Sequence, residues 1–186
     1  MLEFAVSAPF DPAADIAAGI IPAQFPWLSL SILFPIVGAF IVPFIPDQGE
    51  GRQVRWFALG IALVTFLITV GAYLSGYDPS FSGLQLSERV SWLPDLGLTW
   101  AVGADGLSMP LILLTSFITA LAVLAAWPVT FKPKLFFFLI LAMDGGQIAV
   151  FAVQDMLLFF LAWELELLPV YPCLLYTSDA ADEKYR

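Results

Sequence analysis

Three apolar stretches without a single charged side chain constrain the fold of this chain more than any other feature. They cover residues 27–45, 56–76 and 107–127. Each has about the 20 residues that an α-helix needs to cross the hydrocarbon core of a bilayer. Two further apolar stretches, residues 135–153 and 155–171, have similar lengths but contain acidic side chains. The sequence therefore predicts an all-α integral membrane protein with five transmembrane helices.

The composition supports this assignment and narrows the chemistry. Of the 186 residues, 60% are hydrophobic and 12% are charged, whereas soluble domains carry about 25% charged residues. The chain has no histidine and a single cysteine, Cys173. This excludes histidine-based metal or catalytic sites, an intrachain disulfide and a cysteine-rich iron–sulfur site. Because nucleotide-binding glycine motifs and a basic stripe are also absent, we expect a chain that lies in a lipid bilayer and binds no cofactor, metal or nucleic acid.

The polar regions of the chain predict little regular structure apart from one hairpin. Residues 1–25 are acidic, are broken by prolines and lack the basic start of a signal peptide, so we expect a poorly ordered leader. Between the second and third apolar stretches, LQLSERVSWL and LTWAV alternate apolar and polar residues on either side of residues 94–97. This alternation is typical of strands and predicts a small β-hairpin.

The basic residues predict the orientation of the chain in the membrane. Arg52 and Arg55 lie in the loop after the first stretch, and Lys132 and Lys134 lie in the loop after the third. The long connection between the second and third stretches holds Arg89 as its single basic residue, among four acids. The positive-inside rule therefore places the first and third loops on the cytoplasmic or stromal side, and the N-terminus on the outer or lumenal side.

Two carboxylates in the fifth stretch give the sharpest functional signal. A helix that rises about 1.5 Å per residue carries Glu164 roughly 12 Å from its start, near the middle of a bilayer. An acid at that depth is costly and typically faces a bundle interior or a water-filled cavity. A proton relay is therefore the functional hypothesis, and an interhelical hydrogen bond is the structural alternative. Glu166 lies two residues further on, about 200° around the helix, so the two side chains face different sides.

A third intramembrane acid, Asp144, lies in the fourth stretch. Its functional interpretation is a relay group or a water ligand that faces Glu164. The alternative, which we favour, is an anomalous residue without such a role. The following Gly145 and Gly146 predict close packing between helices, and Gln147 is a candidate hydrogen-bond partner at the same interface.

Two further acids are interpreted as helix caps rather than as catalytic groups. Asp155 precedes the fifth stretch, and Asp105 precedes the third stretch together with Ser108. Aspartate and serine side chains accept hydrogen bonds from the free backbone N–H groups of a first helical turn. We therefore assign no catalysis to these positions.

Several long sequence blocks occur together in this chain: FPWLS, GLQLSERVSWLP, WAVGADGLSMPLI, AAWPVTFKPKLFFF and GGQIAVFAVQDMLLFFLAWELELLPVY. In this order they resemble the antiporter-like membrane subunits of complex I. Among these subunits, the resemblance is to the chain 4 family of the NAD(P)H–plastoquinone oxidoreductases of cyanobacteria and plastids. It covers residues 25–171. It departs at Asp144, where family members usually carry an aromatic residue, and from Pro172 onward.

The resemblance implies an antiporter-like helical bundle whose parent subunit translocates protons. Partner subunits of the parent complex would use NAD(P)H or ferredoxin to reduce plastoquinone. In the family, the glutamate that follows the tryptophan of the WE motif pairs with a lysine on a later helix. By position that glutamate is Glu164, whereas Glu166 has no comparably firm role. The expected partners are other membrane subunits of the photosynthetic complex I, and the expected location is a thylakoid or cyanobacterial inner membrane.

The resemblance also implies a division of the chain. Residues 1–25 form the leader, residues 26–171 form the N-terminal transmembrane helices of a truncated antiporter-like domain, and residues 172–186 form a non-native tail that includes Cys173. Because no lysine lies inside a predicted span, we expect the fragment alone not to translocate protons. Two alternatives stay open. One is a subunit of a multisubunit cation/proton antiporter, and the other is a nonfunctional or scaffold membrane fragment.

Overall fold

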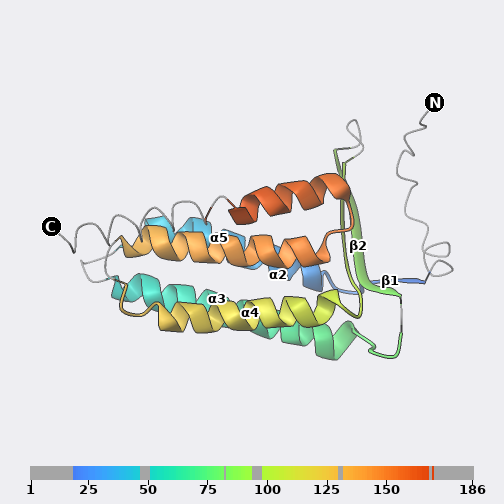
Figure 1. Ribbon diagram of the computed structural model, residues 1–186, viewed down its shortest axis with the longest axis horizontal. Helices are drawn as coiled ribbons and strands as arrows, with labels where there is room; N and C mark the ends of the chain where they lie inside the picture. Colours follow the sequence, from blue (N-terminus) through green and yellow to red (C-terminus); the bar gives the residue numbers. More distant parts are fainter. Residues whose placement is uncertain are drawn as a thin grey trace.

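In the part of the chain that the structure describes, four long helices run side by side in one bundle, and a small sheet lies at one end of it (Figure 1). The computed structural model describes residues 19–46, 51–81, 83–93, 98–129, 132–167 and 169. The helices are α2 (Trp27–Ile41), which continues into the short 3-10 helix η1 (Val42–Phe44), α3 (Arg52–Gly76), α4 (Ser108–Ala125) and α5 (Pro133–Ala152). Within the described residues, these four units are long and apolar enough to cross a membrane. This confirms the prediction of a helical membrane bundle.

A further helical segment covers residues 156–167 and runs back along the bundle after α5 (Figure 1). We refer to residues 156–167 as the return helix. It corresponds to the fifth predicted stretch, whose last residues lie mostly outside the described part of the chain. Residues 1–18 and the tail 172–186 also lie outside the described residues, so the order of the leader and the nature of the tail stay predictions.

The helix α5 is the central one. It is 61% buried along its span, against 33% to 39% for the other three spans. Helices α2 and α4 both pack on it, and α3 packs on α2 and α4. Two glycines near its middle, Gly145 and Gly146, allow this close packing, because neighbouring helices lie where their side chains would be.

A Cβ atom at Gly145 would lie 2.8 Å from the carbonyl oxygen of Ile32 on α2, which is a backbone atom. Gly146, one residue further on, faces the return helix instead. A Cβ atom there would lie 3.3 Å from the backbone nitrogen of Glu166. The two glycines therefore let two different helices approach α5, which confirms the predicted close packing.

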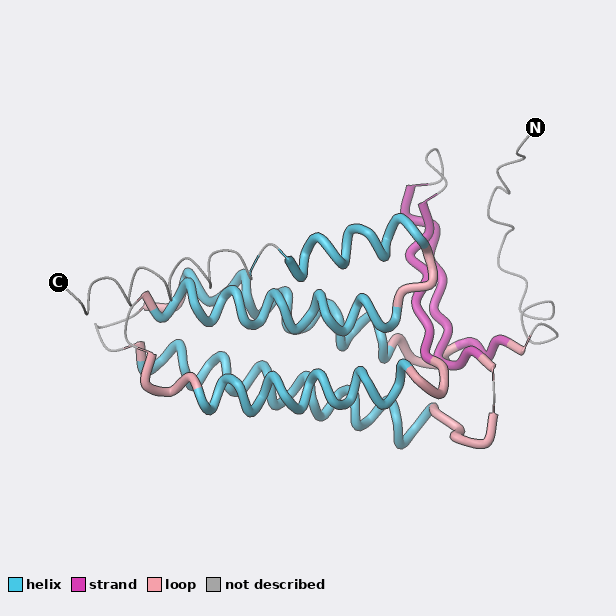
Figure 2. The backbone as a smooth tube through the Cα atoms, viewed as in Figure 1, coloured by secondary structure: helices cyan, strands magenta, loops and turns pink. Residues whose placement is uncertain are grey.

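Three strands form the sheet, in the order β1-β2-β3, and they run across the helix ends (Figure 2). Strands β2 (Leu84–Leu93) and β3 (Leu98–Ala104) pair in antiparallel orientation, which confirms the predicted hairpin. Its turn, residues 94–97, lies outside the described residues. Strand β1 (Ile20–Pro22) pairs in parallel with β2. The structure therefore differs from the expectation of a poorly ordered leader at these three residues, because their order comes from a partner strand far along the chain.

Hydrogen bonds tie the hairpin to the start of α2. The Glu88 carboxylate of β2 accepts hydrogen bonds from the backbone N–H of Leu28, 2.8 Å from Oε1, and of Ser29, 3.1 Å from Oε2. It thereby caps the first turn of α2, where backbone N–H groups lack partners within the helix. The indole N–H of Trp100 on β3 donates to Ser29 Oγ at 2.7 Å. The hairpin is therefore part of the bundle and not a detached loop.

The two ends of the bundle differ in charge. Arg52 and Arg55 lie in the first turn of α3, and Lys132 and Lys134 lie at the start of α5. Both helices begin at the end away from the sheet (Figure 1). Arg55 donates to the backbone carbonyl of Val129 at 2.8 Å, which ties the first turn of α3 to the connection between α4 and α5. The basic residues that predict the orientation of the chain therefore gather at one end of the bundle, opposite the sheet.

Candidate functional site

The direction of the return helix is set by the turn that precedes it. Val153, just after α5, pairs with Val102 of β3. Asp155 Oδ1 then accepts hydrogen bonds from the backbone N–H groups of Leu157 at 2.9 Å and Leu158 at 3.0 Å. This confirms the predicted cap. The sheet and the cap together direct the return helix back along α5.

The predicted cap before α4 is also confirmed. Asp105 Oδ1 accepts hydrogen bonds from the backbone N–H of Leu107 at 3.0 Å and of Ser108 at 2.7 Å. In return, Ser108 Oγ accepts from the backbone N–H of Asp105 at 2.8 Å. The hydrogen bond from the Ser108 backbone holds the pKa of the Asp105 carboxyl below its ordinary value. Asp105 and Ser108 therefore cap the start of α4, as the sequence predicted.

Glu166 lies on the side of the return helix that faces α5. The side-chain amide of Gln147 donates to Glu166 Oε1 at 3.3 Å, which confirms Gln147 as a polar partner at the interface. Gly146 admits the backbone of Glu166 at close range, as described above. The glutamate is half-buried. Among the described residues, no hydrogen bond is recorded to its second carboxylate oxygen.

A cavity of about 240 Å³ opens beside this pair. Two helices and the return helix contribute to it, since Thr115 and Ile118 come from α4, Gln147 and Phe151 come from α5, and Glu166 completes the lining. Its polar groups are one hydroxyl, one amide and one carboxylate. A polar cavity holds water when it has the room and offers two to four partners, and a water molecule takes about 30 Å³ in the liquid. The cavity therefore has the chemistry and the room for several waters.

Glu164 lies on the opposite, outer side of the return helix. Its side chain is exposed, as are those of Leu161 and Trp163 on either side of it. The prediction that the two glutamates face different sides is therefore confirmed. Only Glu166 contacts the rest of the described bundle through a recorded hydrogen bond.

Asp144 is fully buried in the interior of the bundle, on α5. Among the described residues, neither of its carboxylate oxygens has a well-formed hydrogen bond, although the Thr119 side chain of α4 lies close enough for a weak one. Glu164 is exposed on the outer side of the return helix. The structure thus does not bring Asp144 and Glu164 together, and a role for Asp144 stays a prediction.

Two polar contacts were not anticipated from the sequence. The hydroxyl groups of Thr69 on α3 and Ser116 on α4 form a buried hydrogen bond of 2.9 Å. The second is the Glu88 cap on α2, where burial raises the pKa of the carboxyl and the hydrogen bonds from Ser29 and Leu28 partly oppose this. Hydroxyls in apolar helices usually bond their own backbone, and a glutamate in a polar connection is usually solvated. The sequence therefore did not predict the hydrogen bond between the two hydroxyls or the cap formed by the glutamate.

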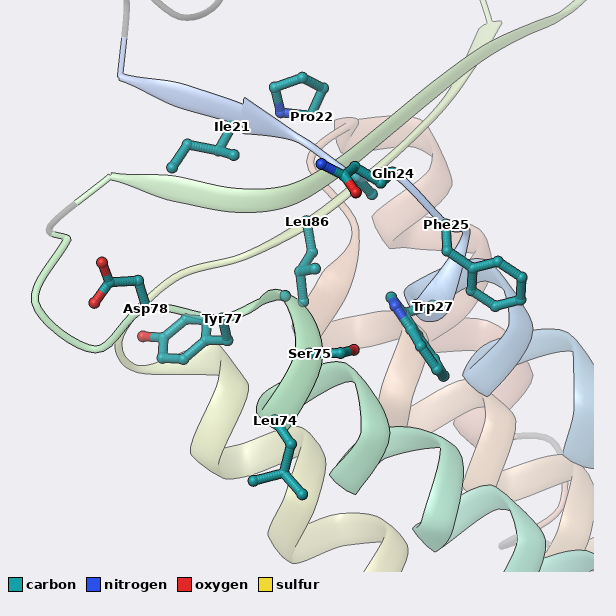
Figure 3. A pocket seen from close by; sticks show the side chains of 12 residues that line it. Ile21, Pro22, Gln24, Phe25, Trp27, Leu74, Ser75, Tyr77, Asp78 and Leu86 are labelled. Carbon is teal, nitrogen blue, oxygen red and sulfur yellow. The ribbon is translucent and has the colours of Figure 1, made fainter.

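A larger cavity of about 490 Å³ lies at the sheet end (Figure 3). It is formed where β1 and the start of α2 meet the end of α3. Trp27 and Tyr77 contribute aromatic rings to its lining, and Ser75 and Asp78 contribute polar side chains. None of the three intramembrane acids lines it, so the candidate site remains the return helix and its contact with α5.

Curated relatives match most of this chain. A protein from Synechococcus sp. (strain WH7803) named NAD(P)H-quinone oxidoreductase chain 4 is 94% identical over 171 residues, which is 92% of this chain. Relatives of the same name from Synechococcus sp. (strain CC9311) and Prochlorococcus marinus (strain MIT 9313) are 91% and 88% identical over the same length. The match covers 30% to 31% of these proteins, so the chain spans somewhat less than a third of their length. No family model matches the chain.

Proposed function

Because this chain belongs to the family of NAD(P)H-quinone oxidoreductase chain 4, we propose that it is part of a proton-translocating membrane subunit of such an oxidoreductase. Partner subunits pass electrons from NAD(P)H or ferredoxin to plastoquinone, and this subunit moves protons across the membrane in response. The redox groups belong to those partners. The activity belongs to the full-length protein, of which this chain spans less than a third in the relatives.

The position of Glu164 is the observation that carries the proposal. Its side chain is exposed on the outer side of the return helix, beside Leu161 and Trp163, which are each 46% exposed. A carboxylate that faces hydrocarbon is costly, so a stable assembly has to cover it with another polar group. The family resemblance supplies that group, because it implies a lysine on a later helix.

A carboxylate and an ammonium group that approach and separate can move protons in one direction. A lysine close to Glu164 stabilises the carboxylate by charge attraction. When the lysine moves away, Glu164 takes up a proton from a hydronium ion on one side of the membrane, which leaves a water molecule. When the charged lysine returns, Glu164 releases that proton to a water molecule on the path to the other side. Each step forms one bond to hydrogen and breaks another, and no electron is exchanged with this chain.

The charge difference between the two ends supports an orientation. The end with Arg52, Arg55, Lys132 and Lys134 lies on the cytoplasmic or stromal side in this proposal, in keeping with the positive-inside rule. The sheet end then lies on the outer or lumenal side. The membrane is a thylakoid membrane or a cyanobacterial inner membrane.

Replacing Glu164 by glutamine in the full-length subunit, within its assembled complex, tests the proposal. We expect proton uptake into vesicles, driven by reduction of a plastoquinone analogue, to fall by roughly 10²-fold, the scale of losing a positioned acid–base group. Glutamine has nearly the same shape, so assembly should be unchanged. Leu161→Met, on the same outer side, is the matched control and should leave uptake at the parental rate.

Parental uptake in Glu164→Gln would contradict the proposal and favour a scaffold role. Proton exchange that depends on Na⁺ or K⁺ and continues without quinone reduction would contradict it in another way, because it would indicate the cation/proton antiporter alternative. The comparisons favour the oxidoreductase family at this point, since each relative reported above carries that name.

A further inference from the structure

We infer that Glu166 is a second proton-binding group of this subunit, which exchanges protons with water held in the cavity between α4, α5 and the return helix. The inference rests on the proton transfer proposed above and deepens it. Glu164 serves the outer side of the return helix, and Glu166 serves the side that faces the bundle. The two positions thus give the return helix one acid on each side.

The geometry places Glu166 at the cavity. It lies ten residues after the start of the return helix at Met156, or about 15 Å along the helix axis, which is roughly half the thickness of the hydrocarbon core. Gly146 allows the two backbones to approach, and Gln147 donates to Glu166 Oε1 at 3.3 Å. The carboxylate is therefore held against α5 by one hydrogen bond, at the edge of the cavity.

The remaining hydrogen-bonding capacity of the site points to water. Gln147 engages one carboxylate oxygen, and the described residues provide no recorded donor to the other. The cavity of about 240 Å³ also contains the Thr115 side chain, which offers both a donor and an acceptor. A carboxylate oxygen that has no donor among the described residues and lies next to a cavity of this size is expected to bond to water. Ile118, another lining residue, is 52% exposed, so the cavity opens towards the outer side of α4.

The proton chemistry of such a site balances without a cofactor. A hydronium ion in the cavity gives its proton to a Glu166 oxygen, which forms a carboxyl O–H bond and leaves a neutral water molecule. The reverse step returns the proton to cavity water. Neither step oxidises or reduces any group. Gln147 remains a neutral donor throughout and positions the carboxylate.

Two substitutions separate proton binding from a purely structural hydrogen bond. Glu166→Gln keeps an oxygen that can accept from Gln147, and so preserves the contact, but it cannot take up a proton at neutral pH. Gln147→Leu removes the donor and keeps the acid. Both variants are made in the full-length subunit within its complex, and proton uptake is measured over a range of pH during reduction of a plastoquinone analogue.

We expect Glu166→Gln to lower proton uptake by roughly 10²-fold, with normal assembly of the complex. Gln147→Leu, which keeps the acid, should retain uptake at a reduced rate, and Glu166→Asp should restore part of the uptake. If Glu166→Gln transfers protons at the parental rate while Gln147→Leu is impaired, Glu166 is a structural acceptor and the inference is wrong.

The Glu164→Gln variant, measured in parallel, distinguishes failure of the inference from failure of the proposed function. If Glu164→Gln abolishes uptake and Glu166→Gln does not, only the second site is overturned. If Glu164→Gln has no effect, the proposed function itself fails. Thr115→Val provides a smaller probe of the cavity, because it removes the hydroxyl with little change of shape and is expected to slow uptake by a few-fold. Uptake at the parental rate in Thr115→Val would count against water bound at that hydroxyl.

Discussion

The carboxylates at the sheet end and those in the helices differ in their hydrogen bonding. At the sheet end, Glu88, Asp105 and Asp155 each accept hydrogen bonds from two different backbone N–H groups. In the helices, Glu166 accepts one hydrogen bond of 3.3 Å, and Asp144 accepts none from the described residues. A carboxylate bonded to a helix end serves as a structural acceptor, whereas a carboxylate with a free oxygen can bind a proton or water.

This difference indicates which acidic residues should affect stability when substituted and which should affect proton transfer. Substitutions at the sheet end should change stability and leave proton transfer per assembled complex intact. Substitutions of Glu164 and Glu166 should do the reverse, as argued above. Three further experiments test the division, and the expected effect on stability decreases from one to the next.

The largest loss of stability is expected for Glu88→Ala. The substitution removes the acceptor for the Leu28 and Ser29 N–H groups and leaves two partly buried donors without a partner. Hydrogen bonds to a charged group contribute about 1.5–3 kcal/mol, and partial exposure of Glu88 places the expected loss near 2 kcal/mol. Denaturant unfolding of the protein in detergent measures this.

Glu88→Gln is the matched control, because its amide oxygen still accepts from one of these donors. It should lose less stability than Glu88→Ala. Equal losses in the two variants would indicate that the charge of Glu88, and not its role as an acceptor, holds the hairpin on α2. If either Glu88 variant lowered proton transfer per assembled complex, the acids at the sheet end would not be purely structural, and the division between the two regions would be wrong.

The helices, the hairpin and the caps could be predicted because their signals are local. Apolar stretches of about 20 residues fix the spans, alternation fixes β2 and β3, and Asp105 and Asp155 precede their helices at cap positions. The spacing of Glu164 and Glu166 sufficed to place them on different sides. In each case the deciding residues lie within a few positions of one another.

The remaining features depend on contacts between distant segments. Strand β1 exists because β2 pairs with it, and Glu88 caps α2 at Leu28, which lies 60 residues earlier in the chain. The cavity at Glu166 needs Thr115 from α4 and Gln147 from α5. A sequence pattern along one segment does not contain this information. The sequence therefore identified Glu166 as an acidic residue within a membrane span, but it could not predict which residues surround it.

Asp144→Leu is expected to have a smaller effect, in the opposite direction. Leucine removes a buried carboxyl whose oxygens have no partner among the described residues, and its side chain has the same branched shape, with bulkier methyl groups in place of the oxygens. An unsatisfied buried polar group costs about 1–3 kcal/mol, so we expect a gain of about 1 kcal/mol in the free energy of unfolding after imperfect packing is included. Asp144→Asn, which keeps a polar group, is the control and should gain less. Impaired proton transfer in Asp144→Leu would instead place Asp144 in the proton path.

The smallest effect is a pH dependence of stability that arises at Glu88. Burial raises the pKa of this carboxyl above its ordinary value of 4.5, although hydrogen bonds from Ser29 and Leu28 oppose the shift. The folded state therefore binds a proton more tightly than the unfolded state. By linkage, stability is greatest below the ordinary pKa and falls as the pH rises from there through the higher pKa of the folded state.

Thermal unfolding of the parental protein and of Glu88→Gln, followed across this pH window, measures the effect. Glutamine does not titrate, so the difference in unfolding temperature between the two proteins should change with pH only inside the window and level off on both sides. A difference of the opposite sign, with the parental protein gaining stability as the pH rises, would mean that the hydrogen bonds at the start of α2 outweigh burial. Glu88 would then stabilise the fold through its charge, and the contrast with the poorly bonded acids of the helices would be sharper still.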